Sequence, residues 1–76
     1  MTVYPNPSTG KLNILFAKPI ARGTVEIQNI LGEKILKQNI YNRSEMVITP
    51  ENISDGIYFM KVFDGANYYI QKLIIQ

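Results

Sequence analysis

The chain has 76 residues, a formal net charge of +2, no cysteine and no histidine. A chain of this length forms one domain, and a domain of about this size buries only about 60% of the surface that its unfolded chain exposes. Without cysteine there is no disulfide, no thiolate metal site and no cysteine nucleophile, and without histidine the commonest general base and metal ligand are missing. We therefore expect neither enzymatic activity nor a cofactor or metal site.

Hydropathy and charge exclude further classes of protein. No apolar run approaches the roughly 20 residues of a transmembrane helix, and the N-terminus lacks the charged and apolar regions of a secretory signal peptide. The eight cationic residues are scattered along the chain against six acidic residues, whereas nucleic-acid-binding proteins cluster their cations on one face. The sequence indicates neither membrane insertion nor nucleic-acid binding.

Short segments rich in Ile, Val, Leu, Tyr and Phe predict β-strands. These strands are expected over residues 11–16, 24–28, 34–40, 45–49, 57–63 and 67–75. In the second segment Val25 and Ile27 alternate with polar residues, which is typical of a strand with one buried face. The segment 57–63 is apolar on both faces, as in a central strand, and Asp64-Gly65 then predicts a hairpin turn.

Turn signals separate these segments at regular intervals. Pro, Gly, Asn, Asp and Ser mark turns or loops at 5–10, 18–19, 22–23, 31–32, 41–44, 50–52, 55–56 and 64–65. No segment has a sustained helical period, and there is no internal repeat or linker. Strands spaced about 8–12 residues apart predict an all-β fold, an antiparallel β-sandwich or small barrel of about seven short strands.

The first long strand is preceded by Tyr4-Pro5-Asn6-Pro7-Ser8-Thr9-Gly10. The two prolines restrict φ and favour extended conformations of the residues before them. One interpretation is protection of an edge strand, because proline offers no N–H donor. The other is a rigid docking turn that a second protein recognises at low entropic cost. For the motif alone the structural interpretation is favoured.

A second motif, in residues 52–58, forms a loop that leads into the central strand. Gly56 is expected to adopt a backbone conformation closed to other residues. Tyr58 carries a large ring with a polar end, and we expect it to anchor the loop over one end of the sandwich.

The third motif is the C-terminal segment, residues 71–76, in which Leu73, Ile74 and Ile75 follow Lys72. Its simplest interpretation is the last strand of the sheet. The functional alternative is recognition by a receptor through strand addition or capture of the terminal carboxylate.

Candidates for catalysis or ligand binding are few. Asp55 and Asp64 each precede a glycine, where Asp is an ordinary turn residue, and no pair of carboxylates resembles that of a glycosidase. Tyr41, Tyr68 and Tyr69 could form an aromatic platform for sugars. Packing or surface tyrosines are the favoured interpretation, because aromatic residues are enriched in strands.

The order and spacing of these motifs resemble the type A C-terminal sorting domain of the type IX (Por) secretion system of Bacteroidetes. The resemblance covers essentially the whole chain, including the segment around Asn29-Ile30-Leu31-Gly32. The residues that match the family's motifs, and that we take as the candidate recognition residues, are Tyr4, Pro5, Asn6, Pro7, Gly10, Gly56, Tyr58, Lys72, Leu73, Ile74 and Ile75.

The resemblance implies an immunoglobulin-like β-sandwich at the C-terminus of an exported cargo protein. Residues 1–76 would then be a single sorting domain excised from a larger exported protein, with Met1 as an added start. The family's domains are recognised in the periplasm by an outer-membrane shuttle of the secretion system. A sortase-like peptidase commonly removes them, and the cargo reaches the cell surface or the medium.

Other functions remain open at this point. A carbohydrate-binding module is suggested by the β-sandwich and the tyrosines, and an immunoglobulin-like spacer would need only the fold. An exposed edge strand would also allow weak homodimerisation by sheet extension.

Overall fold

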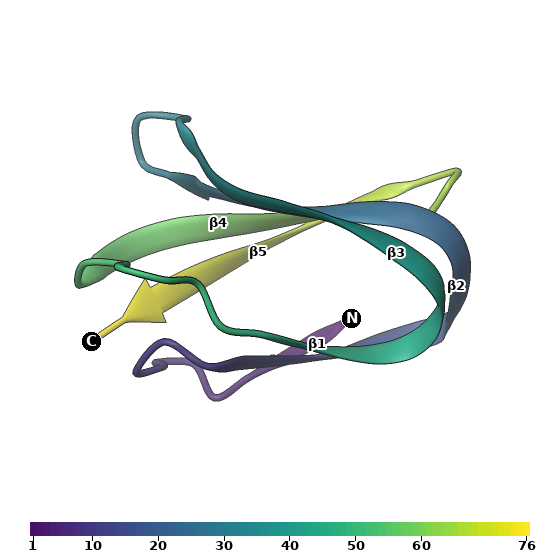
Figure 1. The fold of residues 1–76 in the computed structure, drawn as a ribbon, viewed down its shortest axis with the longest axis horizontal. Coiled ribbons are helices and arrows are strands. Elements are labelled where there is room, and N and C mark those ends of the chain that lie inside the picture. Colours follow the sequence, from purple (N-terminus) through teal and green to yellow (C-terminus); the bar gives the residue numbers. More distant parts are fainter.

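A computed structural model describes all residues, 1–76, and contains five β-strands and no helix. The strands are β1 (Thr2–Tyr4), β2 (Leu12–Asn29), β3 (Lys34–Ile48), β4 (Gly56–Phe63) and β5 (Tyr68–Ile75). Their pairings are all antiparallel and form one sheet in the order β1-β2-β4-β5, with β3 also paired to β2. The sheet curls until its halves face each other (Figure 1). This confirms the all-β, sandwich-like prediction, with fewer strands than expected.

The structure has fewer strands than expected because each of two pairs of expected strands forms one continuous strand. Residues 11–16 and 24–28 belong to one strand, β2, and residues 34–40 and 45–49 belong to β3. The turns expected at 18–19, 22–23 and 41–44 are therefore wrong. The β2–β3 register is irregular between the pairs Leu15↔Glu45 and Ile20↔Arg43, and Asn42 has a φ of 48°. At these positions both strands bend together instead of reversing direction.

The bend places one half of each long strand in each layer. The first part of β2 pairs with β1 and with the end of β3, as in the register pair Ile14↔Met46. The last part of β2 pairs with the start of β3 and with β4, as in Ile27↔Met60. In Figure 1, β1 and the first part of β2 lie opposite β4 and β5.

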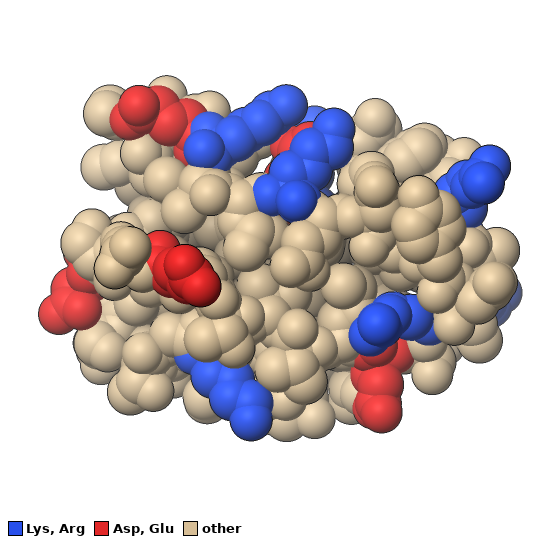
Figure 2. Space-filling view, in the orientation of Figure 1, with Lys and Arg blue, Asp and Glu red and all other residues tan.

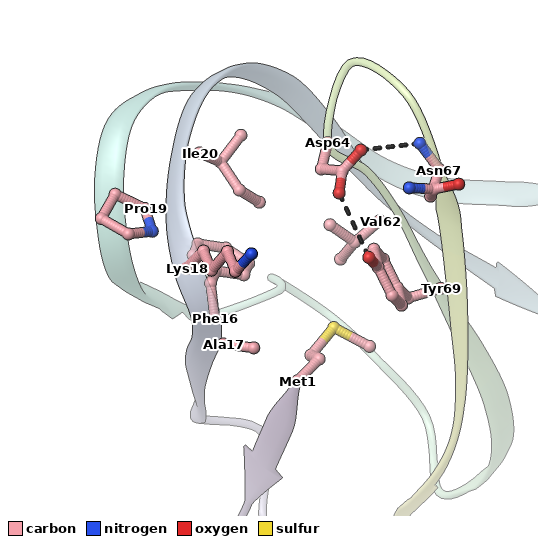
Figure 3. A pocket seen from close by; sticks show the side chains of 10 residues that line it. All are labelled: Met1, Phe16, Ala17, Lys18, Pro19, Ile20, Val62, Asp64, Asn67 and Tyr69. Atoms are coloured by element: carbon pink, nitrogen blue, oxygen red, sulfur yellow. Dashed lines mark hydrogen bonds between the residues drawn. The ribbon is translucent and has the colours of Figure 1, made fainter.

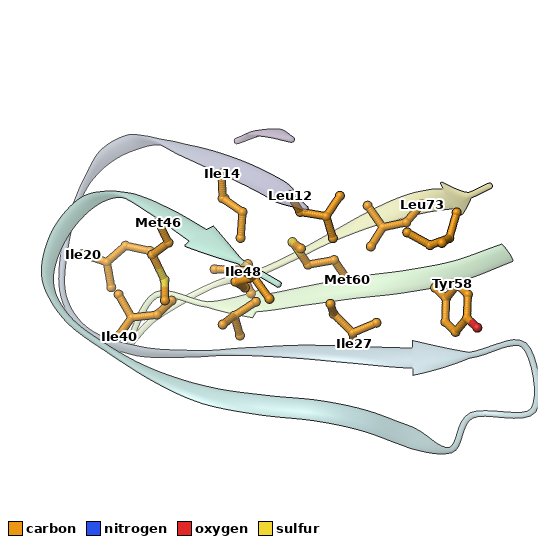
Figure 4. Close-up of a cluster of buried hydrophobic side chains, with 13 residues drawn as sticks. Leu12, Ile14, Ile20, Ile27, Ile40, Met46, Ile48, Tyr58, Met60 and Leu73 are labelled. Carbon is orange, nitrogen blue, oxygen red and sulfur yellow. The ribbon is translucent and has the colours of Figure 1, made fainter. Parts of the chain in front are cut away.

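Side chains that alternate along the strands fill the space between the layers (Figure 4). The buried cluster consists of Leu12, Ile14, Ile20, Val25, Ile27, Ile40, Met46, Ile48, Tyr58, Met60, Val62, Leu73 and Ile75. At about 25 cal/mol per Å² of buried apolar surface, this cluster is the main source of stability.

The strand β4 is internal to the sheet, as the sequence predicts, because β2 and β5 pair with its two edges. Only one of its faces is covered, however. Met60 and Val62 are buried, whereas Ile57 and Phe59 on the opposite face are exposed. The expectation of two buried faces is wrong because no second layer covers the outer side of β4 and β5.

The expected β4–β5 hairpin is confirmed, and its turn connects Phe63 to Tyr68. The turn signal at Leu31-Gly32 also lies where expected, in the β2–β3 hairpin. None of the molecule's segments is a helix of the length and apolarity needed to cross a membrane.

Candidate functional site

The first and third motifs lie side by side, although 66–68 residues separate the bonded positions. The side-chain amide of Asn6 donates from Nδ2 to the carbonyl oxygen of Lys72 at 3.0 Å, and its Oδ1 accepts the backbone N–H of Ile74 at 3.0 Å. The Asn6 side chain thereby takes the place of a peptide group in a neighbouring strand. It closes part of the free edge of β5.

The backbone of Ser8 continues this edge contact. Its N–H donates to the carbonyl oxygen of Ile74 at 2.8 Å, and its carbonyl accepts the N–H of Gln76 at 2.8 Å, in an isolated parallel bridge with Ile75. The first motif thus protects an edge strand through hydrogen bonds of Asn6 and Ser8, whereas the sequence predicts protection by prolines that offer no N–H donor. The protected strand is β5, far away in the sequence, rather than the strand that the motif precedes.

The side chain of Ser8 holds the motif's turn together. Its hydroxyl donates to the carbonyl oxygen of Lys11 at 2.7 Å and accepts the N–H of Gly10 at 3.0 Å. Ser8 is only 2% exposed, although its side chain is polar. A serine two residues before a glycine is a recognisable turn signal, and these bonds of Ser8 to the local backbone fit the turn expected at 5–10.

The second motif adjoins the third in the sheet. Gly56 pairs with Ile75 and Tyr58 pairs with Leu73 in the β4–β5 register. The hydroxyl of Tyr58 donates to the carbonyl oxygen of Ser54 at 2.6 Å and lies 3.2 Å from the hydroxyl of that serine. The tyrosine therefore anchors the β3–β4 loop, as expected. The three motifs form one continuous strip: residues 6–8, the end of β5 and the start of β4.

Burial divides the motif residues into two groups. Tyr58, Leu73, Ile75 and Gly10 are buried and support the fold. The others present surface to solvent: Tyr4, Pro5, Asn6, Pro7, Gly56 and Lys72 are exposed, and Ile74 is half-buried. The exposed group is the part of the strip that a partner could contact.

A separate pocket of about 340 Å³ opens between the bend of β2 and the β4–β5 hairpin (Figure 3). Its lining is partly apolar, with Met1, Phe16 and Val62 among its residues. At its rim the hydroxyl of Tyr69 donates to Oδ2 of Asp64 at 3.2 Å. None of the motif residues lines this pocket, so it is distinct from the strip.

Hydrogen bonds at this rim perturb the ionisation of Asp64 and Tyr69. The backbone N–H groups of Asn67 and Ala66, and then the Tyr69 hydroxyl, hold the pKa of Asp64 below its usual value. The negative charge of Asp64, and then their hydrogen bond, raises the pKa of Tyr69. Asp64 is thus stabilised as a turn carboxylate rather than poised for proton transfer, and no group of acidic side chains could hold a metal ion.

The three tyrosines considered as a sugar platform do not converge. Tyr68 and Tyr69 are consecutive residues of β5, so their rings point to opposite faces of the sheet. The Tyr68 ring stacks on Phe63 with centroids 4.6 Å apart. Tyr41 lies on β3, opposite Arg22 of β2. This arrangement offers no shared aromatic surface.

Charged side chains of both signs are interspersed on the face shown in Figure 2. Glu26 is the acid with ion-pair partners, Lys34 at 3.6 Å and Lys37 at 3.8 Å. These lysines are more than half exposed, so the pairs contribute little to stability.

The chain matches a known protein family. Residues 2–76 match the family model described as a secretion system C-terminal sorting domain, the sorting domain of type IX secretion. Comparison with curated proteins finds no significant match. The family match spans all three motifs and all five strands. The chain belongs to the family of C-terminal sorting domains of type IX secretion, which is a family of sorting signals and not of enzymes.

Proposed function

We propose that residues 1–76 are the sorting domain of a longer exported protein, of type A and from a member of the Bacteroidetes. In the periplasm an outer-membrane shuttle of the type IX machinery recognises the domain and directs its N-terminal cargo across the outer membrane. A sortase-like peptidase then removes the domain, and the cargo remains at the cell surface or is released. The family match supports the sorting role itself.

The observation that carries this proposal is the joining of the three motifs into one strip. Motifs that occur at both ends and near the middle of the chain meet through Asn6, Ser8 and the end of β5. A spacer domain needs the buried residues of the strip but not its exposed ones. We assign recognition to the exposed residues of the strip, and Lys72 carries the longest of their side chains.

The test is export of a fusion protein in a bacterium that has a working type IX system. A signal peptide and a fluorescent reporter precede residues 1–76, and reporter fluorescence is measured in the periplasm, on the surface and in the medium. We expect surface or released reporter with the domain cleaved off. Reporter that stays in the periplasm with an intact domain would contradict the proposal.

Variants of this fusion separate recognition from folding. Deletion of residues 72–76 is expected to abolish export, but it also removes Leu73 and Ile75 from the core. Lys72→Ala removes only an exposed side chain, so it is the sharper variant, and Lys37→Ala is its matched control on the exposed side of β3. Lys72→Ala should lower export while Lys37→Ala leaves it unchanged. Equal export of both variants would show that Lys72 is not a contact.

A further inference from the structure

The most exposed large apolar side chains of the molecule lie in the β2–β3 turn. Ile30 is 71% exposed and Leu31 is 80% exposed. Turns ordinarily present Gly, Asn, Asp, Ser and Pro to water. Two adjacent aliphatic side chains at the tip of a hairpin therefore need an explanation that the fold does not supply.

Hydrogen bonds hold this turn in one conformation. Oδ1 of Asn29 accepts the N–H of Leu31 at 2.9 Å and the N–H of Glu33 at 3.0 Å. Nδ2 of Asn29 donates to Oε1 of Glu33 at 3.0 Å, and two backbone bonds of 3.0 Å connect Asn29 with Glu33 and Gly32. Ile30 and Leu31 are thus displayed on a rigid support, which lowers the entropic cost of burying them in a partner.

The turn borders a hollow of about 280 Å³ that it shares with the β3–β4 loop and the start of β4. Ile35 and Ile57, which also line the hollow, are 42% and 43% exposed and extend the apolar surface beyond the tip. Gly56 and Tyr58 line it as well, so it adjoins the motif strip. In Figure 1 the β2–β3 turn, the β3–β4 loop and the C-terminus all lie at the same end of the molecule.

Two acidic residues lie beside this apolar surface. Glu33 follows the tip in the turn, and Asp55 lines the hollow. The nearest cation in the sequence, Lys34, is paired with Glu26. A complementary partner surface would therefore combine an apolar pocket with basic residues at its rim.

We propose that the β2–β3 turn is a docking element, which inserts Ile30 and Leu31 into an apolar pocket with a basic rim on the secretion protein that recognises the motif strip. This proposal rests on the proposed sorting function and adds a second contact to it. Rigid apolar anchors surrounded by polar contacts are the usual source of affinity at protein interfaces.

The test uses the same reporter fusion, with the double variant Ile30→Thr/Leu31→Asn. Both new side chains suit an exposed turn, so the variant should unfold at the same temperature as the unmodified domain. We expect its export to fall by about tenfold or more, as after loss of a central apolar anchor. The matched control is Ile70→Thr, which removes a side chain that is 67% exposed on β5, away from the turn. It should leave export unchanged.

Further variants decide between docking and stability. Leu31→Met keeps an apolar side chain and should retain export, and Asp55→Lys should lower it by opposing the basic rim. Should the double variant fail to fold, Leu31→Asn alone gives the answer. Export of the folded double variant at the unmodified level would overturn the docking proposal, whereas failure of the unmodified fusion would overturn the sorting function itself.

Discussion

In both the β2–β3 turn and the β4–β5 turn, a side-chain oxygen of the first residue accepts two backbone N–H groups, but the turns display different side chains. Oδ1 of Asn29 accepts two backbone N–H groups in the first turn. In the second turn Oδ1 of Asp64 accepts those of Ala66 and Asn67, at 2.9 and 2.7 Å. The second turn presents only Gly65 and Ala66 at its tip. The aliphatic residues of the first turn are therefore not a requirement of its backbone geometry.

The two turns also differ in their surroundings. A Cβ atom at Gly65 would lie 3.2 Å from the carbonyl oxygen of Arg22, whereas one at Gly32 would meet nothing within 4 Å. The β4–β5 turn is thus packed against β2, and the β2–β3 turn projects freely. A free turn with apolar residues is suited to binding, and a packed turn with small residues is suited to holding the fold together.

The largest effect is expected at the position where β2 supports the β4–β5 turn. A Cβ atom at Gly23 would overlap the carbonyl oxygen of Phe63, the residue before the turn. Because both groups belong to paired backbones, Gly23→Ala should lower the free energy of unfolding by about 3 kcal/mol or more. Urea unfolding measures this change. A variant as stable as the unmodified domain would show that the turn does not depend on this close approach.

A smaller difference should separate the turn glycines. Gly32 and Gly65 have φ values of 84° and 101°, which cost other L-residues about 1–2 kcal/mol. Gly65→Ala also crowds the carbonyl oxygen of Arg22, so it should destabilise the domain more than Gly32→Ala does. Urea unfolding of both variants compares the turns directly. Equal losses of stability would mean that a side chain at Gly65 is no more crowded than one at Gly32.

The smallest effect concerns pH. It distinguishes the β4–β5 turn, which the carboxylate of Asp64 holds, from the β2–β3 turn, which the amide of Asn29 holds. Because its folded-state pKa is lowered, Asp64 stabilises the domain fully at pH values above the pKa of the unfolded state. That stability is lost as pH falls through the folded pKa. The advantage of the unmodified domain over Asp64→Asn should therefore shrink below about pH 4.

Thermal unfolding at several pH values measures this advantage. Gly32→Ala is the control, because it changes no hydrogen bond to a carboxylate, so its effect should stay constant over the same range. An advantage over Asp64→Asn that does not vary with pH would contradict the role assigned to the Asp64 charge.

The local sequence pattern is sufficient to predict much of the fold. The alternation of apolar residues predicted the strand over residues 24–28, and Asp64-Gly65 predicted the hairpin that follows β4. The bends in β2 and β3 carry turn signals in the sequence, because Pro19, Gly23 and Asn42 are residue types that occur both in turns and in bent strands. Whether such a segment reverses or only bends depends on its partner strand, and here β2 and β3 remain paired on both sides of the irregularity.

The sequence by itself determined the all-β class and the order of the three motifs along the chain. Only the tertiary structure decided that Asn6 bonds to the backbone of β5, that Tyr58 and Leu73 are buried while Lys72 is exposed, and that the β2–β3 turn lies beside the strip. Local propensity acts over a few residues. Contacts between positions 66–68 residues apart depend on how the whole sheet curls.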